Sequence, residues 1–285
     1  MDGLFERLQS AVAAIRQRSD LSPRFGVVLG SWLGPLAAEV EDAVAIPFPE
    51  IPGFPRSTML DDPGKLLLGR LAGQPVAVLS ARVHLYEGYT ADEVVFPVQV
   101  LRQLGAEAAI VTNAAGSLDP ALTAGSLLLI ADQINLTGHS PLVGRNDPRL
   151  GPRYVDMAAA YSPELREVAR WVARELGITL AEGVYLGIAG PEFQTPAEVR
   201  LARALGADVV GMSTVLEVVA AGHVGLPILG LSVVSDSASG TPPEDGEQVL
   251  ERARAELAAL IRGVIAAYTP PEPGSVPRSP GNRRK

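Results

Sequence analysis

The sequence has no cysteine and only three histidines among its 285 residues. Without cysteine, the chain can form no disulfide, no thiolate zinc site and no cysteine nucleophile. The histidines His84, His139 and His223 are widely separated in the sequence, so they do not indicate a metal cluster. We therefore expect no bound metal ion.

Long apolar runs and clusters of basic residues are also absent. No apolar stretch reaches the roughly 18 residues that a membrane helix needs. The N-terminus mixes charged residues into a helical pattern and lacks the core of a signal peptide. The net charge is −8, whereas a nucleic-acid surface needs clustered Lys and Arg. We expect a cytoplasmic protein that binds neither membranes nor nucleic acid.

Three motifs of common enzyme classes are missing. The sequence has no GxxxxGK[ST] phosphate loop and no credible GxGxxG, which disfavours a nucleoside triphosphate or a dinucleotide as ligand. It also lacks the GxSxG elbow, which argues against a serine hydrolase.

The sequence does contain short apolar runs that alternate with helical patterns. The runs suit strands covered on both faces, and they lie at 25–30, 76–80, 108–113, 127–131, 184–188, 208–212 and 228–235. Helical periodicity occurs at 1–20, 91–104, 163–176, 195–205, 215–222 and 246–267. This alternation predicts an α/β fold, with a central mixed, largely parallel β-sheet flanked by helices in a single domain over residues 1–268.

Two segments lack such periodicity. Residues 46–64 are punctuated by Pro and Gly and predict a loop long enough to be functional. Residues 269–285 are Pro-rich and polar, which predicts a disordered tail.

Small and hydroxyl-bearing residues follow three of the predicted strands. Ligands gather at the carboxyl ends of parallel strands, and Gly30 and Ser31 lie at such an end, before a helical pattern that could hold an anion. Ala114 lies in the predicted small-residue turn 112–116, which would let a ligand approach the backbone, and Ser213 precedes a helix. Taken singly, these residues are equally typical of a glycine turn or a helix N-cap.

The segment after the second predicted strand is more informative. Arg82, His84 and Tyr86 alternate, so their side chains point to one side of an extended segment. Such polar side chains are unfavourable to bury without partners. Together with the hydroxyls and backbone amides of the other strand ends, they suit a phosphate dianion held by charge-assisted hydrogen bonds.

Six motifs resemble those of the trimeric purine-nucleoside phosphorylases. GSWLG, FPRSTM, RVHLYEGY, TNAAG, GPEFQTPAEVR and GADVVGMSTVLEV stand in the order and approximate spacing of that family, over about residues 5–268. RVHLYEGY, TNAAG and GMSTV in this order are very specific as a set. The family shares its fold with the related methylthioadenosine phosphorylases.

The resemblance implies a role for each matching residue. Phosphate is expected to contact Ser31, Arg82, His84, the Ala114 backbone amide and Ser213. Ribose is expected to contact Tyr86, Met212 and, from the neighbouring subunit of a homotrimer, Tyr154. The purine is expected to contact Phe193 and, at two positions where the residue differs from the family's, Gln194 and Asp236.

The implied reaction is phosphorolysis of a purine nucleoside to free base and ribose 1-phosphate. We expect His84 and Asp236 to be the catalytic residues. Inorganic phosphate is the co-substrate, and neither a metal nor an organic cofactor is expected. Because no enzyme group becomes covalently attached to substrate, catalysis consists of positioning and of stabilising charge on the leaving base.

Four positions depart from the family pattern for 6-oxopurines. Gln194 replaces a glutamate, Asp236 an asparagine and Gly246 a histidine, while a histidine of the 55–64 loop is absent, with Asp62 nearest its place. The loss of these usual groups leaves open a catalytically impaired paralogue that binds purine or phosphate. Trp32 and Leu216 also replace the commoner Gly and Pro.

Hydrogen-bond donors and acceptors make two of these departures informative. Guanine and hypoxanthine present N1–H as donor and O6 as acceptor, and adenine reverses both. Gln194 can donate to adenine N1, and an ionised Asp236 can accept from the 6-amino group. We therefore hypothesise that 6-aminopurine nucleosides are accepted, adenosine or methylthioadenosine, with an inosine and guanosine phosphorylase as the alternative.

Overall fold

The computed structural model describes residues 3–30, 33–58, 64–238 and 246–269. Its centre is a mixed nine-stranded sheet in the order β2-β3-β4-β1-β5-β8-β7-β6-β9. The strands are β1 (Phe25–Val28), β2 (Glu41–Pro47), β3 (Lys65–Leu71), β4 (Gln74–Leu79), β5 (Ala108–Ser117), β6 (Leu127–Asn135), β7 (Leu180–Gly187), β8 (Val209–Gly211) and β9 (Ile228–Ser237).

Helices connect the strands and cover the sheet. The α-helices are α1 (Leu4–Arg16), α2 (Gly34–Ala37), α3 (Ala91–Gln103), α4 (Pro163–Leu176), α5 (Pro196–Ala204), α6 (Val215–His223) and α7 (Gly246–Ala267). Two short 3-10 helices, η1 (Phe48–Glu50) and η2 (Leu85–Glu87), follow β2 and β4. The predicted α/β class with a flanked mixed sheet is confirmed.

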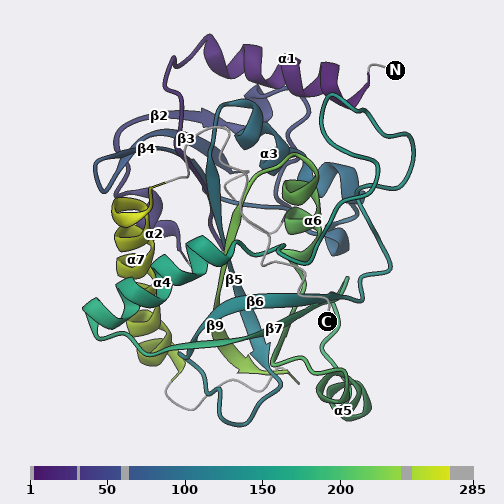
Figure 1. The fold of residues 1–285 in the computed structure, drawn as a ribbon, viewed down its shortest axis with the longest axis vertical. Helices are drawn as coiled ribbons and strands as arrows, with labels where there is room; N and C mark the ends of the chain where they lie inside the picture. The colour runs from purple at the N-terminus through teal and green to yellow at the C-terminus, as the bar shows by residue number, and fades with distance from the viewer. Residues whose placement is uncertain (1–2, 31–32, 59–63, 239–245, 270–285) are drawn as a thin grey trace, which may run out of the picture.

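Apolar residues from both faces of the sheet form two large cores. Helices α1, α3 and α6 pack on one face, and α2, α4 and α7 pack on the other (Figure 1). Alternate residues of β1 enter opposite cores: Val28 packs with the first group of helices, and Val27 with the second. Continuous apolar runs are therefore required in these strands, because both faces are covered.

Five of the strands pair with one another in a closed ring. β5 pairs with both β8 and β9, β9 also pairs with β6, and β7 joins β6 to β8. Within this ring, β5–β9, β6–β7 and β7–β8 are parallel, whereas β5–β8 and β6–β9 are antiparallel. The arrangement brings the C-terminal ends of β5 and β9 and the whole of β8 together.

Local sequence signals explain several helix boundaries. α4 begins after Ser162, whose hydroxyl accepts the Leu165 N–H, and it ends at Gly177, which has a φ of 67°. α5 begins after Thr195, whose hydroxyl and the Glu198 carboxylate form a reciprocal capping box. Serine and threonine N-caps and a glycine in the left-handed region are the usual ends of helices, and the predicted range 163–176 is confirmed.

Two sequence-based assignments were incomplete. The predicted loop 46–64 overlaps the end of β2 and contains η1, and neither β2 nor β3 was predicted. β2 is an edge strand whose first three residues are exposed, so it lacks a continuous apolar run. Among the described residues no helix is long and apolar enough to cross a membrane. The predicted tail lies outside the described residues from position 270 onward.

Candidate active site

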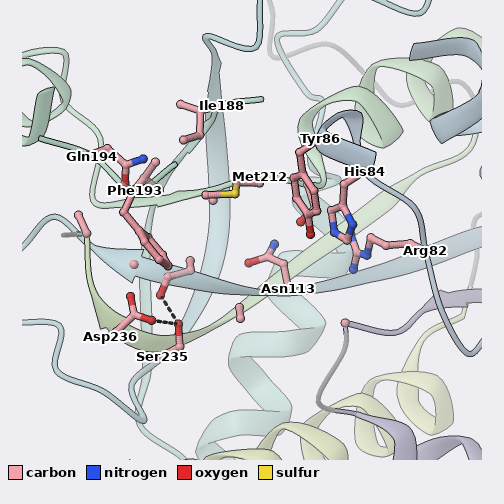
Figure 2. Close-up of a pocket in the computed structure, with 18 residues that line it drawn as sticks. Arg82, His84, Tyr86, Asn113, Ile188, Phe193, Gln194, Met212, Ser235 and Asp236 are labelled. Atoms are coloured by element: carbon pink, nitrogen blue, oxygen red, sulfur yellow. Dashed lines mark hydrogen bonds between the residues drawn. The ribbon is translucent and has the colours of Figure 1, made fainter. Parts of the chain in front are cut away.

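A cavity of about 260 Å³ lies where the C-terminal ends of β5, β8 and β9 meet the segment that follows β4. Figure 2 shows Arg82, His84 and Tyr86 at one end and Phe193, Gln194 and Asp236 at the other. Ligands commonly bind at this edge of an α/β sheet. The residues at its two ends make one end of the cavity basic and give the other end an aromatic ring, an amide and a carboxyl group.

The structure brings nine of the residues named from the sequence to this one cavity. They are Arg82, His84, Tyr86, Ala114, Phe193, Gln194, Met212, Ser213 and Asp236. Ser31 lies outside the described residues, although Gly30 beside it lines the cavity. The individual binding roles stay predictions.

Tyr154 is not among the cavity-lining residues of this chain. Its side chain is 88% exposed, in the segment between β6 and α4. An exposed aromatic is compatible with a residue that contacts a neighbouring subunit. The homotrimer and this role of Tyr154 stay predictions.

Arg82 is held by buried partners at the basic end. Its Nη1 lies 2.8 Å from Glu217 Oε2, and the two side chains are 6% and 3% exposed. Its Nη2 donates to the Thr112 carbonyl. A second Nη1 hydrogen bond, of 3.4 Å, reaches Thr214 Oγ1. The guanidinium is therefore fixed beside the cavity by three acceptors.

His84 is fixed by Glu87, and its ring stacks on that of Tyr86 with the ring centroids 4.7 Å apart. Glu87 Oε1 lies 2.8 Å from the His84 backbone nitrogen and 2.9 Å from Nδ1. Burial raises the pKa of Glu87, but hydrogen bonds from Thr58 and His84 outweigh it and keep the pKa below its usual value. An ionised Glu87 can only accept, so we infer that Nδ1 carries the proton. In neutral His84, Nε2 is then a hydrogen-bond acceptor.

The pKa of His84 is lowered, first by burial and second by the charge of Arg82. In the unfolded chain the imidazole titrates near its ordinary value of about 6.5. Unfolded His84 then binds a proton that folded His84 does not, so stability falls as pH drops through about 6.5. We expect His84→Gln to flatten the fall in the free energy of unfolding between about pH 7 and 5, measured by urea denaturation.

The exposed His139 offers a matched control for this measurement. His139→Gln should leave the wild-type pH dependence intact, while His223, whose pKa burial also lowers, accounts for part of the remaining slope. A His84→Gln profile parallel to that of the wild type would contradict a neutral, buried His84.

Asp236 is half-buried at the opposite end. Burial raises its pKa, and the hydrogen bond from Ser235 opposes that shift. Ser235 Oγ lies 3.0 Å from Asp236 Oδ2 and 3.4 Å from the Ala115 carbonyl (Figure 2). Gln194 and Phe193 face the same end of the cavity. A carboxyl with a raised pKa can accept a hydrogen bond when ionised or donate one when protonated.

Two details of the motifs differ from the sequence-based interpretation. Residues 112–116 form part of β5 instead of a turn, because β5 continues along β9 as far as Ser117. A Cβ at Gly116 would lie 2.9 Å from Ala238 Cα, so close packing against β9 and the residue after it requires this glycine. The N-cap of α6 is Thr214, not Ser213.

Sequence reasoning missed two polar residues of the cavity. Asn113 and Ser235 each precede a named residue, Ala114 and Asp236, and both line the cavity. A signal was available, because polar side chains interrupt two otherwise apolar strands there. Asn113 Oδ1 accepts from Ser232 at 2.7 Å, and its Nδ2 donates to Thr214 at 2.9 Å.

Comparison with known proteins supplies independent evidence. The sequence profile described as "Phosphorylase superfamily" matches residues 24–266. The chain is 43% identical over 268 residues to purine nucleoside phosphorylase 1 of Bacillus subtilis (strain 168), which covers 92% of this chain and 99% of that protein.

Solved structures agree with this match. Isoform 2 of purine nucleoside phosphorylase from Schistosoma mansoni, in complex with cytosine and ribose-1-phosphate, has a TM-score of 0.87 at 33% identity, over 93% of this chain and 97% of that chain. Purine nucleoside phosphorylase from the same organism, in complex with adenosine, has a TM-score of 0.85 at 34% identity, over 93% and 98% of the two chains.

Proposed function

We propose that this chain, which belongs to the phosphorylase superfamily and is a purine nucleoside phosphorylase, accepts 6-aminopurine nucleosides, adenosine or methylthioadenosine. It transfers ribose from the purine to inorganic phosphate, giving free base and ribose 1-phosphate. The observation that carries the base preference is the presence of Gln194 and Asp236 together at one end of the cavity.

Phosphate is proposed to bind at the basic end. Arg82 supplies charged N–H donors, Ser213 a hydroxyl and Ala114 a backbone amide, and all three residues line the cavity. Neutral His84 accepts from a phosphate hydroxyl through Nε2. Charge-assisted hydrogen bonds to a phosphate are stronger than those between neutral groups, so these residues can hold the nucleophile in place.

The nucleoside is proposed to lie between this phosphate and Asp236. Tyr86 and Met212 contact the ribose, and Phe193 packs against the purine ring. The glycosidic bond lengthens to an oxocarbenium-like ribosyl, and phosphate attacks C1′ from the opposite face, which inverts the configuration. Protonated Asp236 donates to N7 as negative charge grows on the leaving base, and its raised pKa supports that role.

Base preference follows from donors and acceptors at the purine end. Gln194 can turn its amide to donate to adenine N1, whereas a glutamate could only accept from N1–H of a 6-oxopurine. While the O–H of Asp236 is directed to N7, its carbonyl oxygen accepts from a 6-amino group but would face O6 acceptor to acceptor. A mispaired buried polar group costs about 1–3 kcal/mol. This corresponds to roughly 5- to 150-fold in discrimination.

Three further features belong to the proposal. Two copies of the chain complete each site in a homotrimer, in which the exposed Tyr154 reaches the sugar bound by its neighbour. Gly246, the first residue of α7, has no side chain to fill the 5′ end, so a 5′-methylthio group is accommodated. The enzyme acts in the cytoplasm with phosphate as co-substrate and with no metal or organic cofactor.

Steady-state rates with inosine, guanosine, adenosine and methylthioadenosine test the base preference. At saturating phosphate, we expect kcat/KM for adenosine or methylthioadenosine to equal or exceed that for guanosine, with the freed base identified by chromatography. A guanosine value tenfold or more above both would overturn the preference and leave an inosine and guanosine phosphorylase.

A further inference from the structure

Glu217 is a buried carboxylate for which the proposed reaction has no use. It lies in the first turn of α6 and does not line the candidate active-site cavity. Its side chain is 3% exposed and lies 2.8 Å from Arg82. Charged side chains are seldom buried to this degree without a specific partner. The pairing therefore calls for a role beyond packing.

The hydrogen bonds of Arg82 leave two of its N–H donors available for a ligand. A guanidinium has five N–H donors. In Arg82 the Nη1 nitrogen donates to Glu217 and Thr214, and Nη2 donates once to the Thr112 carbonyl. The part of the chain that the structure describes offers no acceptor to the remaining two donors. Two N–H groups are the number that a planar guanidinium presents to one phosphate.

The turn that carries Glu217 also carries Ser213. Thr214 between them is buried, and its φ of 69° and ψ of −54° are unusual for a β-branched residue. Asn113 Nδ2 donates to Thr214 Oγ1 at 2.9 Å and thereby ties this turn to β5. The surrounding contacts must impose this backbone conformation. The conformation determines the positions of both the Ser213 hydroxyl and the Glu217 carboxylate.

We propose that Glu217 is a positioning residue, which holds the Arg82 guanidinium in its phosphate-binding orientation before phosphate arrives. The proposal rests on the proposed function, since it assigns phosphate to Arg82. An arginine side chain has many rotamers, and a buried cation needs a counter-charge until the anion binds. Glu217 supplies both restraints from outside the candidate active-site cavity, so binding phosphate requires little reorganisation.

Substitutions of Glu217 distinguish its effect on the orientation of Arg82 from the effect of its own negative charge. Glu217→Ala removes the carboxylate, and we expect KM for phosphate to rise at least about tenfold while KM for the nucleoside changes less than about twofold. Glu217→Gln keeps an acceptor oxygen at the same place without the charge, so it should recover most of the phosphate affinity. Glu217→Asp keeps the charge but withdraws it by one methylene, so it should raise KM for phosphate more than the Gln variant does.

Val218→Ala is the matched control. Val218 is fully buried on the same helix and does not line the candidate active-site cavity, so its truncation loosens α6 without removing a partner of Arg82. We expect this variant to melt at a lower temperature with an unchanged KM for phosphate. If Glu217→Ala does not fold, the Asp and Gln variants decide by the same comparison.

Three results would overturn the positioning role. The first is an unchanged or lower KM for phosphate in Glu217→Ala, which would mean that the Glu217 carboxylate only competes with phosphate for Arg82. The second is an equal rise in Val218→Ala, which would indicate general loosening. The third, should Glu217→Ala not fold, is Glu217→Asp with a KM for phosphate no higher than that of Glu217→Gln. Failure of the proposed function is distinguishable, because wild-type protein would then release no base with phosphate present.

Discussion

Arg82→Ala is expected to lower kcat/KM for phosphate by about 10²- to 10⁴-fold. The variant loses two N–H donors, and each hydrogen bond to a charged group contributes roughly 1.5–3 kcal/mol. KM for the nucleoside should change far less, because Arg82 lies at the end of the cavity away from Phe193 and Asp236 (Figure 2). Initial rates measured over a range of phosphate concentrations, at fixed saturating nucleoside, give the value directly.

This substitution also leaves Glu217 buried without its partner. Breaking a buried pair costs about 3–5 kcal/mol of stability, so the assay belongs well below the melting temperature of the variant. Arg102→Ala is a suitable control, since Arg102 also donates to backbone carbonyls, those of Val224 and Ala106, but lies outside the cavity. If Arg82→Ala and Arg102→Ala had the same kcat/KM for phosphate, Arg82 would not bind phosphate.

Asp236→Asn is expected to shift base preference toward guanosine and inosine by roughly 10- to 100-fold relative to adenosine. The asparagine amide can donate to O6, which the carbonyl oxygen of Asp236 cannot while the O–H is directed to N7, and each corrected or lost pairing changes binding by about 1–3 kcal/mol. Adenosine turnover should fall at the same time, because the amide cannot supply a carboxyl proton to N7. The ratio of kcat/KM for guanosine to that for adenosine is the quantity to measure.

Asp208→Asn provides the matched control for this change. Asp208 is a partly buried carboxylate that accepts the Val184 N–H at 2.7 Å, outside the cavity. Its variant should keep the wild-type ratio of guanosine to adenosine. A ratio in Asp236→Asn within twofold of wild type would show that Asp236 does not read the base.

The fold was predictable where local signals and burial agreed. The α4 and α7 ranges match the predicted 163–176 and 246–267, because helical periodicity coincided with Ser162 and Gly177 at the ends of α4. β2 escaped prediction because an edge strand with exposed residues has no continuous apolar run. The TNAAG segment has the sequence of a turn, since nothing local indicates that β9 lies alongside it to extend β5.

The residues of the site could be predicted from the sequence, but the contacts among them could not. The ends of strands can be located in a sequence, so Arg82, His84 and Ser213 are predictable as candidate site residues. Pairings between distant segments are not readable in this way. Glu217 lies 135 residues from Arg82, and its spacing on α6 resembles that of any residue on a helix. Glu87 likewise gains significance only once it contacts the His84 ring.

The phosphate dependence of the reaction with adenosine tests the proposed reaction most directly. Purified protein is incubated with adenosine, with and without phosphate, and both the base and the sugar product are identified. We predict release of adenine only when phosphate is present, in equal amount to ribose 1-phosphate of inverted configuration. Release of base at the same rate without phosphate, with free ribose as product, would contradict it, and so would binding of purine with no release under either condition.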